Sequence, residues 1–346
     1  MAKAVKLADI AEQLGVSTVT VSKALSGQKG VSEVMREKIK NLAEEMGYKQ
    51  PSAIKKEKVQ RSYNIGVLVS ERYLGEYDSF YWKMYQSVAT KAVQKECFTL
   101  LEIIPLAGER ELALPKMVVE EKVDGLIIVG RLQTEYLAAL NKNTQIPMVY
   151  LDFYDEQQMN DAVISNSYYG SYTLTNYLFN MGHKDIAYVG TLLCTASITD
   201  RYFGYARSMM EHGKEIPAEW IIPDRDMQSG VVKVDIDYNR MEQKPTAFVC
   251  NCDLTASEVI NCLEEQGYRV PEDASVIGFD NYLYPGLCDV DITTYEVDVK
   301  EMSRRAVHVL LKKIEDSRYK QGITIVDGHV VYKNSVKAVS YTHLRA

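Results

Sequence analysis

The chain has 346 residues, of which 46% are hydrophobic, enough for a large core and for two or three domains of ordinary size. It has neither an apolar run of membrane-spanning length nor an apolar segment behind its first lysines, so we expect a cytoplasmic protein with no membrane partner and no secretion signal. The cysteines are scattered rather than spaced as zinc ligands, and we expect reduced thiols at Cys97, Cys194, Cys250, Cys252, Cys262 and Cys288.

The net charge of −7 conceals a split along the chain. Residues 1–61 contain 12 Lys and Arg against 7 Asp and Glu, whereas residues 62–346 contain 28 against 40. A basic head joined to an acidic body indicates a nucleic-acid-binding segment. An ordinary solvated basic face would carry the same charge, so charge alone leaves both readings open.

The head has the pattern of three short helices. The first, expected over 6–14, has an apolar stripe at helical spacing, formed by Leu7, Ile10, Ala11 and Leu14. The second follows Ser17 as its cap, buries Val21, Ala24 and Leu25, and leaves an outward face of Thr18, Thr20, Ser22 and Lys23. The third follows Ser32 and ends at Gly47. This spacing predicts a helix-turn-helix whose second helix enters the major groove; the alternative is a small helical cap with solvated polar faces.

The same residues resemble a known family. The chain shows L-x-D-I-A, then G-V-S-x-x-T-V-S, then V-S-x-x-x-R-x-x-I and a closing G-Y, and in this it is similar to the DNA-binding head of the LacI/GalR transcriptional regulators. The resemblance implies that Thr18, Val19 and Lys23 read bases. It also implies phosphate contacts from Ser17, Thr20, Ser22 and Ser32, in keeping with the division between positioning and specifying contacts.

Residues 49–61 are expected to form a linker, since they contain a proline and five Lys and Arg. In the family this segment forms a hinge helix with a leucine that wedges into the minor groove. Here that position falls on Glu57 or Lys58, neither of which can intercalate as an apolar wedge; the alternative is that Ile54 or Val59 takes its place. We therefore expect a weakly kinked operator, with Lys55 and Lys56 lying along phosphates.

From Asn64 onward, short apolar runs alternate with helical stretches. The runs are at 65–69, 124–130, 147–152, 186–190, 246–250 and 274–280. Runs of this length, rich in Val and Ile, are typical of parallel strands buried on both faces. They predict an α/β body of two lobes with ligands beyond the carboxyl ends of the strands, and crossings between the lobes after Val163 and near Thr294.

The body also resembles the LacI/GalR family, whose effector-binding core is similar to type I periplasmic sugar-binding proteins. The shared strings are GHKDIAYVG at 182–190, DRYFGY at 200–205, PTAFVC at 245–250 and VPEDASVIGFDN at 270–281. The fold class expected is therefore an all-α helix-turn-helix head joined to a two-lobed α/β body with parallel sheets.

The resemblance implies effector contacts from Phe80, Tyr81, Asp152, Arg201 and Asp280. Structural alternatives exist for each: the aromatic pair can be a packing cluster at a helix start, Arg201 can pair with Asp200, and the aspartates can cap helices. Cys252 stands where many relatives have Asn, and the segment before Ser229 is polar where relatives often have an aromatic residue. We expect a sugar or sugar derivative as effector, with a nucleobase or nucleoside as the alternative.

The expected domains follow from these patterns. They are a helix-turn-helix domain at 1–48, a hinge at 49–61, an effector-binding and dimerisation domain at 62–338, and a tail foreign to the fold at 339–346. Within the body, the first lobe is expected to comprise 62–163 plus 294–320 and the second 164–293 plus 321–338.

These features predict a sequence-specific regulator, most simply a repressor, that binds double-stranded operator DNA and a small effector, expected to be a carbohydrate. A solute-binding receptor of the same body fold is the alternative, but it would have no use for the head. The chain shows no G-x-x-x-x-G-K, H-E-x-x-H or G-x-S-x-G string, so we expect no enzyme activity, cofactor or metal. Leucine heptads are missing near the end of the chain, which makes a homodimer the expected assembly.

Overall fold

The computed structural model describes residues 5–48, 62–74, 79–155, 160–227 and 229–339. The chain forms two compact units, Met1–Arg61 and Ser62–Ala346, which are described separately below. Over the described ranges, no helix combines the length and apolar character that a membrane crossing requires.

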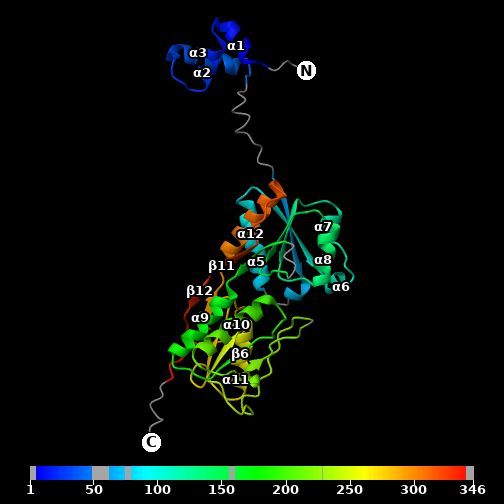
Figure 1. Ribbon diagram of the computed structural model, residues 1–346, viewed down its shortest axis with the longest axis vertical. Coiled ribbons are helices and arrows are strands. Elements are labelled where there is room, and N and C mark those ends of the chain that lie inside the picture. The colour runs from blue at the N-terminus through cyan, green and yellow to red at the C-terminus, as the bar shows by residue number, and fades with distance from the viewer. Residues whose placement is uncertain (1–4, 49–61, 75–78, 156–159, 228, 340–346) are drawn as a thin grey trace. The chain divides into compact units, whose positions relative to one another are not determined.

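The first unit, the head, consists of three helices, α1 (Leu7–Leu14), α2 (Thr18–Leu25) and α3 (Glu33–Glu45), as the apolar spacing predicts (Figure 1). Ser17 caps α2 by accepting a hydrogen bond from the Thr20 backbone N–H at 3.1 Å, and Ser32 caps α3 through the Met35 N–H at 3.4 Å. The helices enclose a small core of Ile10, Ala11, Val21, Ala24, Ile39 and Ala43.

The second unit, the body, begins with a six-stranded parallel sheet in the order β11-β5-β4-β3-β1-β2. Its strands are β1 (Asn64–Ser70), β2 (Phe98–Ile104), β3 (Gly125–Val129), β4 (Met148–Leu151), β5 (Asp161–Ser165) and β11 (Ile323–Val326). This sheet and its helices are called the first lobe. The central strands are buried on both faces, which is why they read as continuous apolar runs.

Helices cover both faces of the first-lobe sheet. Those on one face are α5 (Phe80–Val93) and α12 (Val299–Glu315), whose Met84 and Met302 pack with Val67 and Ile127. The opposite face is covered by α7 (Lys116–Val119) and α8 (Thr134–Asn143). Two short helices, η1 (Glu71–Tyr73) and α6 (Leu106–Arg110), lie at the carboxyl ends of β1 and β2.

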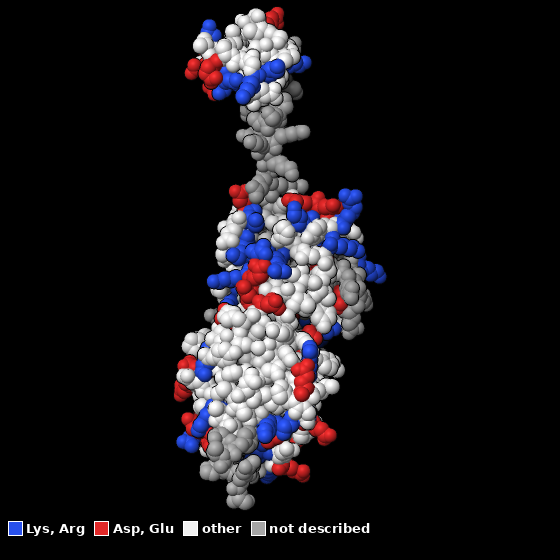
Figure 2. Space-filling view, turned by 60° about the vertical axis from the view of Figure 1, so that its left-hand side comes forward, with Lys and Arg blue, Asp and Glu red and all other residues white. Residues whose placement is uncertain are grey.

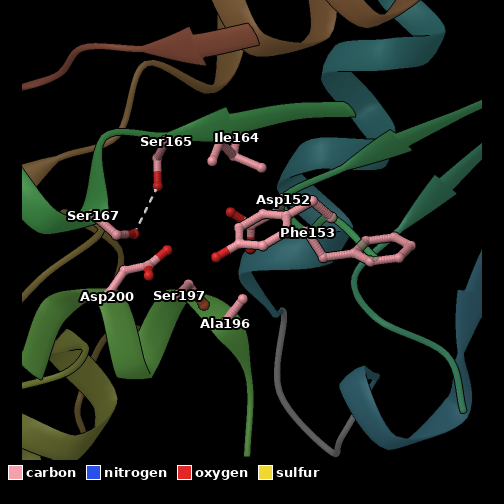
Figure 3. Close-up of a pocket in the computed structure, with 9 residues that line it drawn as sticks. Asp152, Phe153, Ile164, Ser165, Ser167, Ala196, Ser197 and Asp200 are labelled. Atoms are coloured by element: carbon pink, nitrogen blue, oxygen red, sulfur yellow. Dashed lines mark hydrogen bonds between the residues drawn. The ribbon is translucent and has the colours of Figure 1, made fainter. Parts of the chain in front are cut away.

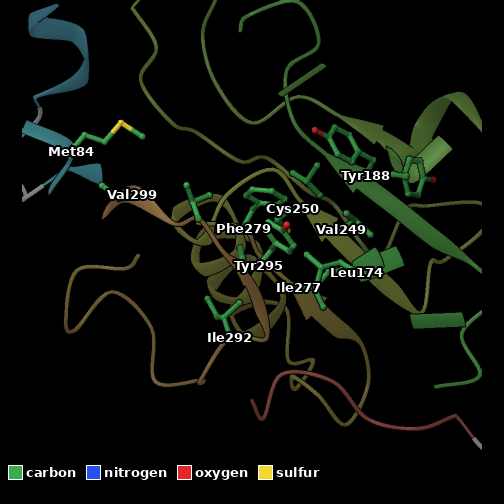
Figure 4. Packing of buried hydrophobic residues seen from close by; sticks show 14 of the residues in the cluster. Met84, Leu174, Tyr188, Val249, Cys250, Ile277, Phe279, Ile292, Tyr295 and Val299 are labelled. Carbon is green, nitrogen blue, oxygen red and sulfur yellow. The ribbon is translucent and has the colours of Figure 1, made fainter. Parts of the chain in front are cut away.

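The second lobe contains a four-stranded parallel sheet in the order β7-β6-β8-β9. Its strands are β6 (Ile186–Val189), β7 (Ile221–Ile222), β8 (Ala247–Cys250) and β9 (Ser275–Ile277). Its helices are α9 (Ser167–Asn180), α10 (Ala196–Glu211), η2 (Ala218–Trp220) and α11 (Asp253–Glu265). Figure 4 shows part of its core, where Phe279 and Tyr295 pack 5.0 Å apart between ring centroids.

The connections between the lobes correct the expected lobe boundaries. Residues 161–165 complete β5, so the first crossing follows Ser165 rather than Val163. β10 (Thr294–Glu296) pairs antiparallel with β12 (His329–Val331) beside the second lobe, and the chain enters the first lobe only with α12.

The segment 321–338 was expected in the second lobe, yet its β11 is the edge strand of the first sheet, paired with β5. Alternate residues of β11 are buried, which suits an edge strand covered on one face. The expected tail boundary also moves by one residue, because the Val339 N–H donates to the Met181 carbonyl at 2.8 Å; residues 340–346 lie outside the described chain.

On the face shown in Figure 2, charged side chains gather over the first lobe, while the middle of the second lobe is largely uncharged. The charged residues of the body, basic as well as acidic, are therefore not spread evenly over this surface.

Candidate functional site

The five residues expected to contact the effector all belong to the body and come from the carboxyl side of its two sheets. Asp152 follows β4, and Asp280 lies shortly after β9. Both have left-handed backbone, with φ of 70° and 95°, and neither caps a described helix. Phe80 and Tyr81 begin α5, and Arg201 lies on α10.

Arg201 is 5% exposed and forms the centre of the second-lobe side of the site. Its Nη2 donates to Asp280 Oδ1 at 3.1 Å, its Nη1 to the Asn251 carbonyl, and its Nε to Ser167 Oγ at 3.4 Å. The guanidinium carbon lies 3.9 Å from the ring centroid of Phe279. The structure thus pairs Arg201 with Asp280, not with the neighbouring Asp200, and holds the guanidinium in one orientation.

The first-lobe side of the site is aromatic. The Tyr81 hydroxyl donates to Asp152 Oδ2 at 3.3 Å, and the Tyr81 ring lies 4.4 Å from that of Tyr73. Phe80 contacts Tyr81 edge-on at 5.9 Å and reaches Tyr282 of the second lobe at 6.2 Å. Phe80 and Tyr81 therefore do begin a helix and pack, as the structural alternative holds, and they also face the second lobe.

A small pocket lies between the lobes beside these residues (Figure 3). The first lobe contributes Asp152, Phe153, Tyr154, Ile164 and Ser165, and the second contributes Ser167, Ala196, Ser197 and Asp200. Of the five expected residues only Asp152 lines the pocket itself. Tyr81 forms a hydrogen bond with Asp152 and Arg201 forms one with Ser167, so each contacts a residue that lines the pocket.

Burial controls the carboxyl groups of the site. It raises the pKa of Asp152 to about 7, opposed by Arg201 and reinforced by Asp280. Burial likewise raises the pKa of Asp280, although Arg201 pulls it down. For Arg201 burial works toward a lower pKa, but Asp280 and Asp152 more than compensate and raise it. A cation shared by two buried carboxyls favours ligands that offer both hydrogen-bond donors and acceptors.

Sequence reasoning missed several residues at this edge. Tyr73 packs against Tyr81 with tilted rings, Phe279 lies against Arg201, and Tyr282 contacts Phe80. Asp253 is 2% exposed, and burial raises its pKa to about 8. Each follows closely on the end of a strand, which is the signal that would have selected them.

A second buried charge cluster occupies the carboxyl ends of β6, β7 and β8. Arg225 donates from Nε and Nη2 to Asp224 Oδ2 at 2.9 and 2.7 Å, and Nη2 also reaches Asn251 Oδ1 at 3.1 Å. Burial acts to raise the pKa of Asp224, but the hydrogen bond and charge of Arg225, together with hydrogen bonds from Thr255 and the Thr191 N–H, outweigh burial and lower that pKa to about 2. Cys252, where relatives often have Asn, lies within 3.6 Å of Arg225 Nη2.

In the head, α2 turns a polar face outward. Thr18, Val19, Ser22 and Lys23 are exposed, and Thr20 is half-buried. Val21 and Ala24 are buried, as expected, while Leu25 is only half-buried. Lys55 and Lys56, the other residues expected on DNA, lie outside the described residues, as does the whole hinge.

Two family sequence models match the chain. The model of bacterial regulatory proteins of the lacI family matches residues 6–51, and that of the periplasmic binding protein-like domain matches residues 175–336. The HTH-type transcriptional repressor PurR of Aliivibrio salmonicida is 30% identical over 331 residues, which cover 95% of this chain and 98% of that protein.

The chain belongs to the LacI/GalR family of transcriptional regulators. As a member of that family it is a DNA-binding transcriptional repressor. The PurR repressor of Vibrio campbellii is a further relative, 27% identical over 339 residues that cover 96% of this chain and 98% of that protein.

Solved structures of transcriptional regulators share the fold. The lac repressor dimer bound to operator and the anti-inducer ONPF is 23% identical, with a TM-score of 0.64 over 97% of this chain and 100% of that chain. The transcriptional regulator CelR in complex with cellobiose is 19% identical, with a TM-score of 0.66 over 96% of this chain and 99% of that chain.

Proposed function

We propose that this repressor binds operator DNA as a homodimer and that a nucleobase or nucleoside, bound between the two lobes, sets its operator affinity. The observation that carries the proposal is the composition of the site. An aromatic wall of Tyr73, Phe80 and Tyr81 stands beside the ion pair of Arg201 and Asp280. Aromatic rings suit a planar ligand, and an adjacent guanidinium and carboxylate suit the donor and acceptor groups on its edge.

This proposal departs from the sugar expected from the sequence. The curated relatives named PurR favour a purine-type ligand over a carbohydrate. The carboxyls of Asp152 and Asp280 would also accept hydroxyl groups, so a carbohydrate is retained as an outcome of the test.

The mechanism follows from two sites coupled by one protein. A ligand that contacts both lobes binds the closed arrangement better than the open one and shifts the equilibrium between them. In a dimer this shift changes the spacing of the two heads against the operator half-sites. Linkage then requires that operator binding change ligand affinity by the same factor.

The test is a thermal-shift screen of the full chain against purine bases, nucleosides and sugars. A ligand at 100 times its dissociation constant stabilises the folded state by about 2.7 kcal/mol, which raises the melting temperature by about 5 °C or more. Operator titrations with and without the hit then give the sign of the response. Stabilisation by sugars alone would overturn the proposed ligand class.

The head is tested separately. We propose that Thr18, Val19 and Lys23 read bases, while Ser17, Thr20, Ser22, Ser32, Lys55 and Lys56 contact phosphates. Lys23→Ala should relax the preference at one base position in each half-site, at a cost of about 1–3 kcal/mol. Lys40→Ala, an exposed lysine on α3, is the control and should leave the selected motif unchanged. An unchanged motif with Lys23→Ala would refute the base-reading role.

A further inference from the structure

We propose that Glu109 is a positioning residue for the effector pocket: its buried carboxylate holds in place the loops that carry the aromatic wall of Tyr73 and Tyr81. The proposal rests on the proposed function of the pocket. Glu109 lies on α6 and is fully buried, although it neither lines the pocket nor contacts any of the five expected residues.

One carboxylate joins α6 to two other segments, the connection from β1 into η1 and the loop after β3. Glu109 Oε1 accepts from Ser70 Oγ at the end of β1, and Oε2 accepts from Arg72 Nη2 in η1 at 2.8 Å. Oε2 also accepts the backbone N–H of Gln133, after β3, at 2.8 Å. Arg72 Nε donates back to Ser70 Oγ at 3.1 Å, which closes a ring of contacts.

The loops that Glu109 holds are in direct contact with the aromatic side chains of Tyr73 and Tyr81. Tyr73 follows Arg72, and the Arg72 guanidinium carbon lies 5.9 Å from the Tyr73 ring centroid. The Tyr73 hydroxyl donates to the Arg131 carbonyl at 2.7 Å, in the same loop that ends at Gln133. A Cβ on Gly130 would lie 2.8 Å from Tyr73 and 2.9 Å from Tyr81. The two rings are therefore packed against the loop after β3. The Tyr81 hydroxyl in turn forms a hydrogen bond with Asp152, which lines the pocket.

The chemistry explains why a carboxylate suits this place. A fully buried carboxylate is costly unless its oxygens are paired and hydrogen-bonded. An apolar side chain in its place would fill the space but could not accept an N–H, a hydroxyl and a guanidinium together. The charge therefore determines the geometry of the loops more than the stability of the fold.

The same sheet offers a matched control on β5, next to its other edge strand. Asp161 begins β5, is 5% exposed, and accepts Lys313 Nζ at 2.9 Å together with the N–H groups of Gln321 and Gly322 at 3.0 and 2.7 Å. It is a buried, multiply bonded carboxylate like Glu109, but it lies at the amino end of its strand. Its partners belong to α12 and the approach to β11, not to the pocket.

The experiment compares Glu109→Gln with Asp161→Asn in the full chain. Three quantities are measured: the free energy of unfolding in urea, the near-ultraviolet circular dichroism of the tyrosines, and the affinity for guanine by calorimetry. We expect both variants to lose stability, but only Glu109→Gln to change the tyrosine dichroism and to weaken guanine binding tenfold or more. Glu109→Asp keeps the negative charge and should recover part of the tyrosine dichroism and part of the guanine affinity.

The outcomes separate the two proposals. If the unaltered protein binds neither guanine nor any other base or nucleoside of the screen, the proposed ligand class fails, while the dichroism still tests Glu109. If Glu109→Gln and Asp161→Asn give the same dichroism and the same guanine affinity as the unaltered protein, Glu109 is only structural. Should Glu109→Gln not fold, Glu109→Asp decides the matter by the same two readouts.

Discussion

Removing the Arg201 guanidinium provides the most informative test of the pocket. Arg201→Met keeps much of the side-chain volume but leaves Asp280 buried without its partner, since the two side chains are only 5% and 11% exposed. Breaking a buried pair by removing one member costs about 3–5 kcal/mol. That is a large share of the roughly 5–15 kcal/mol by which a domain is stable.

The double variant Arg201→Met with Asp280→Asn removes both charges. It should recover at least 1 kcal/mol of the loss, because the uncompensated carboxylate is gone. The loss in Arg201→Met alone should be smaller at pH 5 than at pH 8, since burial already raises the pKa of Asp280 and the unpaired carboxyl takes up a proton more readily.

Urea unfolding of the full chain measures these differences. The control is Arg207→Met on the same helix, whose pair with Glu211 is 52% and 43% exposed. Because solvent screens that exposed pair, Arg207→Met should lose far less stability than Arg201→Met. Arg201→Met should also abolish the response of operator binding to ligand, while operator affinity without ligand stays within a few fold. A loss of stability below 1 kcal/mol, or double-variant effects that simply add, would refute this account of the pair.

Two further predictions concern the head and the protonation of the pocket. Arg36 Nη1 donates to the Ala24 carbonyl at 3.0 Å and Nη2 to the Gln28 carbonyl at 2.9 Å. Arg36→Ala should therefore destabilise the head by about 1–3 kcal/mol and weaken operator binding, while the ligand affinity of the body stays unchanged. An operator affinity equal to that of the unaltered protein in gel shifts would contradict this prediction. Burial raises the pKa of Asp152 to about 7, so the folded state keeps a proton that the unfolded chain releases, and the free energy of unfolding should fall as pH rises from about 4 to 7. Asp152→Asn should flatten that decline by about 1.4 kcal/mol per pH unit in urea titrations across this range, and an unaltered slope would show that Asp152 is charged throughout.

Local patterns were enough for the head and for the central strands. The helices of the head begin at Ser17 and Ser32 because these side chains cap them, and their buried faces follow the 3.6-residue period. The strands at 65–69, 124–130 and 147–152 were predictable because both of their faces are buried, which leaves an uninterrupted apolar run.

Edge strands and crossings could not be predicted in the same way. β11 exposes alternate residues, β2 is fully buried only at Ile104, and β10 and β12 are only three residues long, so none of them forms a buried apolar run. The assignment of 321–338 to the second lobe failed for this reason. Strand order depends on pairings between residues far apart in the chain, such as Ile325 with Ile164, and local periodicity carries no information about them.

The candidate site, like the fold, was predictable from the sequence only in part. Sequence resemblance selected Arg201 and Asp280, and the end of each strand marked where such residues should lie. Only the tertiary structure decided that Arg201 pairs with Asp280 rather than Asp200, that Tyr73 packs against Tyr81, and that Glu109 joins α6 to two other loops. The sequence determines which side chains are available at each strand end. Their pairing depends on how the two sheets and the crossings between them bring distant segments together. Burial then decides which of these charges must be paired with an opposite charge.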